Sequence, residues 1–177
     1  KSNSNGVGVA RNIGINFSQG SYITFLDADD IMSSFFQYKV HPFLKKDEYK
    51  DVDFFIFDSI YFDRNRKIVK KYYSDINHEM IGTNIFEESF FSKKIIVVPW
   101  GKVFKKNFLM DNKIKFQQVN EWEDVIFIRH ASFYARKVVG INNYLYFARI
   151  SLESRSRAFP KNFFKEARKS LNLEKNF

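Results

Sequence analysis

The sequence predicts an α/β fold, a mixed sheet flanked by helices. A helical pattern over residues 6–18 is followed at once by a strand-like run over residues 21–26. A second β-rich run, DFFIFDSIYF, covers residues 53–62. Later, a helical stretch over residues 123–136 leads into a last strand at residues 144–150. A helix followed by a strand at the front, with mixed elements behind, favours an α/β sheet with some antiparallel edges.

The first elements are justified residue by residue. In the first helix, three apolar residues recur at every fourth position: Val9, Ile13 and Phe17. Gly20 stands where a glycine commonly ends a helix. A second helix is expected at residues 35–44, interrupted near Pro42, whose ring removes a backbone donor.

The later elements begin with a hairpin. The turn DRNR joins the second β-rich run to a strand at residues 67–73. Residues 84–91 have a helical pattern, and VVPWGKVFKK predicts a loop followed by a short strand or a turn. In the helix at residues 123–136 one stripe is apolar: Ile128, Ala131 and Ala135. A basic helix at about residues 160–177 is expected after the last strand.

Composition bounds the class of protein. The chain has 177 residues, 45% of them hydrophobic, which suits one globular domain over residues 1–177. There is no cysteine, which excludes disulfides and thiolate zinc sites, and no apolar run approaches the ~20 residues of a membrane span. The net charge of +9 suits an anionic partner, such as a nucleotide, a membrane surface or nucleic acid, or else simply keeps the surface soluble.

Three carboxylates follow the strand at residues 21–26: Asp27, Asp29 and Asp30. Ligands of open α/β sheets bind outside the carboxyl ends of strands. Asp27 and Asp29 are separated by one residue, so they can converge on a hard cation such as Mg²⁺ or Mn²⁺, which would share its ligands with substrate phosphates. The alternative is a turn followed by a helix that Asp30 caps.

A second acidic group opens the helix at residues 123–136. Asp124 shares a stripe with Ile128 and Ala131, so its side chain is expected to point inward, where a carboxylate can act as a general base. The alternative is that Glu121, Glu123 and Asp124 only stabilise the positive end of the helix dipole.

The segment GVGVARNIGINFSQGSYITFLDADD resembles the central segment of family 2 glycosyltransferases with the GT-A fold. Those enzymes show a helix carrying A-R-N-x-G, a small-residue turn, a strand and then D-A-D-D. The matching positions are Ala10, Arg11, Asn12, Gly14, Gly20 and residues 27–30. The resemblance implies that Asp29 is the main metal ligand, that Asp27 lies beside the ribose and the ion, and that Asp30 supports or caps the turn. Arg11 is either a ligand of the diphosphate or a solvated helix residue.

Three further segments carry the resemblance. Glu123 and Asp124 match the E-D motif of the family, which implies that Asp124 is the base and that Glu123 lies in the substrate site. PWGKVFKKNFL resembles W-x-K-x-F/Y, which implies a sugar-stacking or packing role for Trp100 and an anion contact for Lys102. YLYFARISLESRSR resembles Y-x-Y/F-x-R, where the basic candidates for a diphosphate or anionic acceptor are Arg149, Arg155 and Arg157.

The resemblance implies an inverting, metal-dependent glycosyltransferase. Its expected partners are a nucleotide sugar, most simply a UDP-sugar, a glycan or lipid-linked acceptor, and an anionic membrane surface at the inner face of the bacterial cytoplasmic membrane. The expected cofactor is Mn²⁺ or Mg²⁺, and the expected process is synthesis of a surface polysaccharide. No histidine follows His130, so the cation would depend on Asp29, the diphosphate and water.

The resemblance begins after the first strand-helix-strand portion of the family's domain. We therefore expect a GT-A-like sheet that lacks its first βαβ portion, and little or no activity from residues 1–177 alone. Other readings are a nucleotidyltransferase with the same site, a non-catalytic partner domain and a basic nucleic-acid-binding module. The aromatic residues fall in apolar runs and are not interleaved with Lys and Arg, so no nucleic-acid partner is expected.

Overall fold

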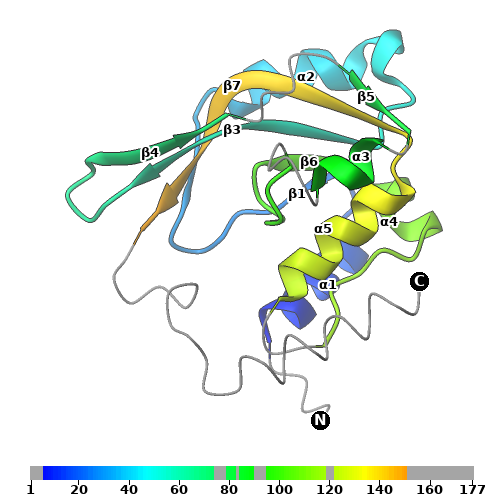
Figure 1. The fold of residues 1–177 in the computed structure, drawn as a ribbon, viewed down its shortest axis with the longest axis horizontal. Helices are drawn as coiled ribbons and strands as arrows, with labels where there is room; N and C mark the ends of the chain where they lie inside the picture. The colour runs from blue at the N-terminus through cyan, green and yellow to red at the C-terminus, as the bar shows by residue number, and fades with distance from the viewer. Residues whose placement is uncertain (1–5, 74–78, 83, 90–94, 119–121, 151–177) are drawn as a thin grey trace.

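The computed structural model describes residues 6–73, 79–82, 84–89, 95–118 and 122–150 (Figure 1). Its helices are α1 (Val7–Phe17), α2 (Phe36–Lys45), α3 (Asn84–Glu87), α4 (Lys106–Asp111) and α5 (Glu123–Tyr134), with one 3-10 turn at Asp47–Tyr49. Its strands are β1 (Tyr22–Thr24), β2 (Ile31–Met32), β3 (Phe54–Phe62), β4 (Ile68–Tyr72), β5 (Glu79–Ile81), β6 (Lys102–Lys105) and β7 (Lys137–Arg149). The predicted α/β class is confirmed.

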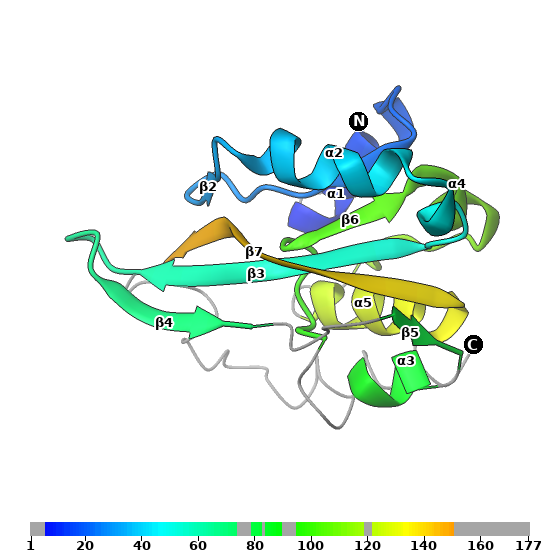
Figure 2. The same ribbon diagram turned by 90° about the horizontal axis from the view of Figure 1, so that it is seen from above.

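The strands form one mixed sheet in the order β1-β6-β3-β7-β2, with β4 paired to β3 and β5 paired to β7. β3 and β7 run parallel, whereas the other described pairs are antiparallel. Figure 2 shows α2 on one face of the sheet and α5 with α3 on the other. Phe54 and Ile56 of β3 enter one core cluster and Phe55 and Phe57 enter the other, so both faces of this strand are buried. Burial on both faces explains its nearly continuous apolar sequence.

The helix α1 forms where predicted, but the apolar stripe that predicted it does not face the protein. Ile13 is 52% exposed and Phe17 is 82% exposed, whereas Gly8 and Ile15 are buried. In this orientation Ile15 enters the core, and the Asn12 side chain is bonded to the main chain ahead of α5. Pattern alone could not reveal a helix that turns its polar motif inward.

Two further expectations need correction. The helix α2 continues through Pro42 and is not interrupted there. The last strand begins at Lys137, earlier than predicted, and runs to Arg149. Its pairing with β3 skips Asn142 and Asn143, because Phe57 faces Ile141 and the next residue faces Tyr144. Two turn-forming residues therefore occupy a bulge inside a strand.

The remaining expectations are largely met. The hairpin of β3 and β4, the strand β6 and the buried stripe of α5 all form where predicted. The predicted helix at residues 84–91 begins as α3, and its end, like the predicted C-terminal helix, lies outside the described residues. Among the described helices, none combines the length and apolar character that crossing a bilayer requires.

Candidate active site

An acidic turn, residues 27–30, follows β1 at the end of the sheet. The Asp30 amide donates a hydrogen bond to the Asp27 carbonyl over 3.1 Å and closes the turn. The Asp27 side chain is half-buried, whereas Asp29 is exposed at the tip. The turn thus presents one carboxylate to solvent and one to the interior.

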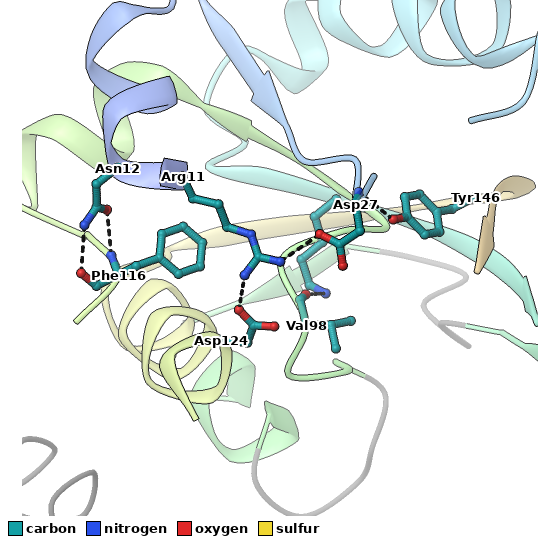
Figure 3. Close-up of polar contacts among 8 residues, drawn as sticks. Arg11, Asn12, Asp27, Val98, Phe116, Asp124 and Tyr146 are labelled. Atoms are coloured by element: carbon teal, nitrogen blue, oxygen red, sulfur yellow. Dashed lines mark hydrogen bonds and ion pairs between the residues drawn. The ribbon is translucent and has the colours of Figure 1, made fainter. Parts of the chain in front are cut away.

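The helix α1 is fixed against the segment that leads into α5. The side-chain Nδ2 of Asn12 donates to the Phe116 main-chain carbonyl over 2.8 Å, and the Phe116 main-chain amide donates to Oδ1 of Asn12 over 2.9 Å (Figure 3). Gly8 permits the close approach, because a Cβ there would lie 3.0 Å from Cβ of Phe116. With α1 held in this position, the side chain of the preceding residue, Arg11, points toward the acidic turn.

The Arg11 guanidinium joins the two predicted acidic groups. Its Nη2 lies 2.8 Å from Oδ1 of Asp27, and its Nη1 forms an ion pair with Oδ1 of Asp124 (Figure 3). The guanidinium lies over the Phe116 ring, 5.2 Å from its centre, and only 11% of the side chain is exposed. A planar fork with fixed donors suits this bridging role. The carboxylates of Asp27 and Asp124, which are far apart in sequence, therefore share one guanidinium group.

Asp124 lies in the first turn of α5, where the helix dipole favours a carboxylate. Burial nevertheless raises the pKa of Asp124 to about 6, helped by the charges of Glu123 and Asp27 and opposed by Arg11. A carboxylate that titrates near pH 6 is mostly ionised at neutral pH and still basic enough to accept a proton. The residue before the motif, Trp122, has a left-handed backbone (φ 71°), which is uncommon for a bulky side chain.

The other predicted site residues have different surroundings. Lys102 is completely buried, and its ammonium donates to the carbonyls of Ile96 and Val98 over 2.8 Å each. Burial lowers the pKa of Lys102 to about 7. Trp100 is buried and stacks flat on Tyr146, with ring centres 4.7 Å apart. Their predicted substrate contacts stay predictions, since here both side chains face protein groups.

The basic candidates lie at the end of β7 or beyond. Arg149 is exposed, and its main-chain amide donates to Oδ1 of Asp30 over 2.8 Å. Arg155 and Arg157 lie outside the described residues. Glu123 is half-buried beside α1, where its Cγ lies 3.5 Å from the position that a Gly8 Cβ would take.

Sequence reasoning missed Tyr146, which is fully buried with its hydroxyl at the acidic turn. The hydroxyl accepts from the Asp27 amide over 3.2 Å and donates to Oδ2 of Asp30 over 2.6 Å. A tyrosine inside an apolar strand was the available signal, because a buried hydroxyl normally needs a partner.

The turn offers hard oxygen donors of the kind that Mg²⁺ and Mn²⁺ prefer. Oδ1 of Asp27 is already paired with Arg11, and Asp29 is exposed. Within the described ranges, no group of three acidic, histidine or cysteine side chains is placed to hold a metal ion. The residues therefore fit a cation that takes one or two protein ligands and completes its coordination with phosphate oxygens and water.

Solved structures of S. aureus TarS share this fold. The crystal structure of TarS residues 1–349 in complex with UDP-GlcNAc matches with a TM-score of 0.70 at 20% identity, covering 96% of this chain and 47% of that chain. The same fragment in complex with UDP matches with a TM-score of 0.64 at 21% identity, covering 85% and 42%. At such identity the likeness shows the fold.

Curated relatives are similar in sequence. The Poly(ribitol-phosphate) beta-glucosyltransferase of Bacillus spizizenii is 28% identical over 92% of this chain and 25% of its own length. The Cholesterol galactosyltransferase of Borreliella burgdorferi is 27% identical over 80% and 41%, respectively. Glycosyltransferase GlyA of Streptococcus pneumoniae serotype 4 is 26% identical over 87% and 22%. The chain thus spans less than half of the length of each of these relatives.

The family assignment comes from a match that covers most of the chain. The sequence profile described as Glycosyl transferase family 2 matches residues 1–140 of 177. These residues include α1, the acidic turn and the start of α5, which carry Arg11, Asp27 and Asp124. The chain therefore belongs to glycosyl transferase family 2.

Proposed function

We propose that this chain carries the catalytic acids of an inverting glycosyltransferase that moves a sugar from a UDP-sugar to a hydroxyl acceptor. The observation that carries the proposal is the pair of ion pairs that Arg11 forms with Asp27 and Asp124, because they hold the acidic turn next to the candidate base. The UDP and UDP-GlcNAc complexes of TarS support the donor class.

Asp124 accepts the proton of the attacking acceptor hydroxyl in this proposal. The acceptor oxygen then forms a bond to C1 of the sugar, while the bond from C1 to the phosphate oxygen breaks and its electron pair leaves with UDP. One base and one displacement invert the anomeric carbon. The pKa of Asp124, which burial raises to about 6, suits a base that works near neutral pH.

Asp29 and Asp27 would hold Mn²⁺ or Mg²⁺ through their carboxylate oxygens, with Asp29 as the main ligand. When bound, such a cation neutralises charge on the diphosphate of the donor. Arg11 keeps Asp27 oriented and supplies a positive charge beside both acids. Asp29 is exposed at the tip of the turn, which leaves its oxygens open to an ion carried in with the nucleotide.

The acceptor belongs to the proposal as well. The named relatives support a polymer or lipid that presents a hydroxyl, as in the poly(ribitol-phosphate) and cholesterol transferases. We propose synthesis of a bacterial surface polysaccharide at the inner face of the cytoplasmic membrane, where the net charge of +9 would favour anionic partners.

The test is transfer by the full-length protein, assayed on a panel of nucleotide sugars with Mn²⁺. Asp124→Asn is expected to lower kcat by about 10²–10⁴-fold with UDP-sugar affinity retained, since a general base contributes that much. Asp29→Ala is expected to lose Mn²⁺-dependent UDP binding. Asp111→Asn, on the exposed end of α4, is the matched control. Full turnover by Asp124→Asn, or a product with the anomeric configuration of the donor, would contradict the proposal.

A further inference from the structure

The Tyr146 hydroxyl is bonded to both ends of the acidic turn. It accepts a hydrogen bond from the Asp27 amide over 3.2 Å, a contact drawn in Figure 3. It donates to Oδ2 of Asp30 over 2.6 Å. One hydroxyl from the sheet thus spans the turn on which Asp29 is exposed.

Asp30 also bonds the same turn to β7 through its other carboxylate oxygen. Its Oδ1 accepts from the Arg149 amide over 2.8 Å, so both carboxylate oxygens bind groups of β7. The next residues, Ile31 and Met32, pair with Phe147 and Tyr146 as the short strand β2. Bonds to an ionised acceptor are among the stronger hydrogen bonds in proteins. The carboxylate of Asp30 therefore faces the sheet, while that of Asp29 is left at the surface.

Packing fixes the tyrosine ring that carries this hydroxyl. Trp100 stacks on the Tyr146 ring at an interplanar angle of 4°, and Tyr61 packs edge-on against Trp100 at 5.8 Å. The loop that brings Trp100 there is held by the buried Lys102, whose ammonium binds two of its carbonyls. With both rings buried, the hydroxyl has little freedom to leave the turn.

We propose that Tyr146 and Asp30 are positioning residues that fix the backbone of residues 27–30, so that the Asp29 carboxylate stays directed at the cation and diphosphate of the donor. This inference rests on the proposed function for the identity of the ligand. It also assigns Trp100 the task of holding the Tyr146 ring. Neither positioning residue needs to contact the substrate.

The experiment compares Tyr146→Phe with Tyr144→Phe, the same substitution two residues earlier on β7. The Mn²⁺ affinity of the full-length protein is measured in the presence of UDP by electron paramagnetic resonance of the ion. Loss of a charge-assisted hydrogen bond predicts about tenfold to a hundredfold weaker Mn²⁺ binding in Tyr146→Phe. Tyr144→Phe is expected to match the parent within about twofold. Asp30→Asn is expected to weaken binding in the same direction, because an amide offers only one acceptor oxygen.

Hydrogen exchange of the ligand-free protein tests the anchoring independently of function. The amides of Asp27 and Asp30 are expected to exchange faster in Tyr146→Phe than in Tyr144→Phe. Exchange and Mn²⁺ affinity equal to those of the control would overturn the inference. If the parent binds no Mn²⁺ with UDP, the proposed function fails, whereas the exchange arm still decides whether Tyr146 holds the turn.

Discussion

Replacing Arg11 by methionine tests how the positive charge of Arg11 affects the pKa of the candidate base, Asp124. Methionine can keep the contact over the Phe116 ring but removes both ion pairs. Burial raises the pKa of Asp124 to about 6, and Arg11 opposes that rise. Without Arg11 the pKa of Asp124 therefore increases further, by about one to three pH units for a neighbouring charge at such distances.

This increase has a measurable size. At pH 7 a base with a pKa near 6 is about 90% ionised, and a rise of one to three pH units would leave between about half and about one hundredth ionised. We expect kcat/KM of Arg11→Met at pH 7 to fall by about twofold to a hundredfold. The acid limb of the pH profile should move up, and activity should recover toward the parent's at alkaline pH.

Two controls sharpen the assay. Arg11→Lys keeps a positive charge but loses the fork, so its acid limb should lie between those of the parent and Arg11→Met. Lys45→Met, at the exposed end of α2, should leave the profile unchanged. If Arg11→Met lost activity equally at every pH, with its acid limb still near pH 6, the tuning of Asp124 by Arg11 would be refuted. A direct contact between Arg11 and the diphosphate would then explain the loss.

Two further predictions concern stability. Burial lowers the pKa of Lys102 from its ordinary value of 10.5 to about 7, so the unfolded chain binds more protons than the folded chain between these two pH values. The free energy of unfolding should therefore rise with pH across that window, by at most about 1.4 kcal/mol per pH unit. Denaturation curves of Lys102→Met should lack this contribution. Gly8→Ala should destabilise the fold by about 1–3 kcal/mol, because its Cβ would lie 3.0 Å from Cβ of Phe116. Gly14→Ala, with nothing within 4 Å of its Cβ, should instead stabilise α1 by up to about 1 kcal/mol. Equal midpoints for the two alanine variants in urea would count against the docking of α1.

Much of the site was predictable because its residues are grouped along the sequence. The acidic turn follows an apolar strand, and Asp124 lies in the first turn of a helix that carries an apolar stripe, so each is recognised locally. The same holds for the hairpin and for the strand β3, whose nearly continuous apolar run is buried on both faces.

Tertiary contacts decided what could not be predicted. No local pattern pairs Arg11 with Asp124, because that contact depends on how α1 docks against the segment before α5. In α1, Ile13 is exposed while Arg11 and Asn12 are half-buried, which reverses what helical periodicity indicates. The Tyr146 hydroxyl reaches residues 27–30 because β2 pairs with β7, and β2 is too short to be seen in the sequence.

A crystal structure of the full-length protein with Mn²⁺ and a non-transferable UDP-sugar would test the proposed site most directly. We expect Asp29 to coordinate the ion together with diphosphate oxygens, and Asp124 to face C1 of the sugar from the side opposite the diphosphate. An ion bound away from residues 27–30, or a sugar carbon out of reach of Asp124, would contradict the roles proposed for the two carboxylates.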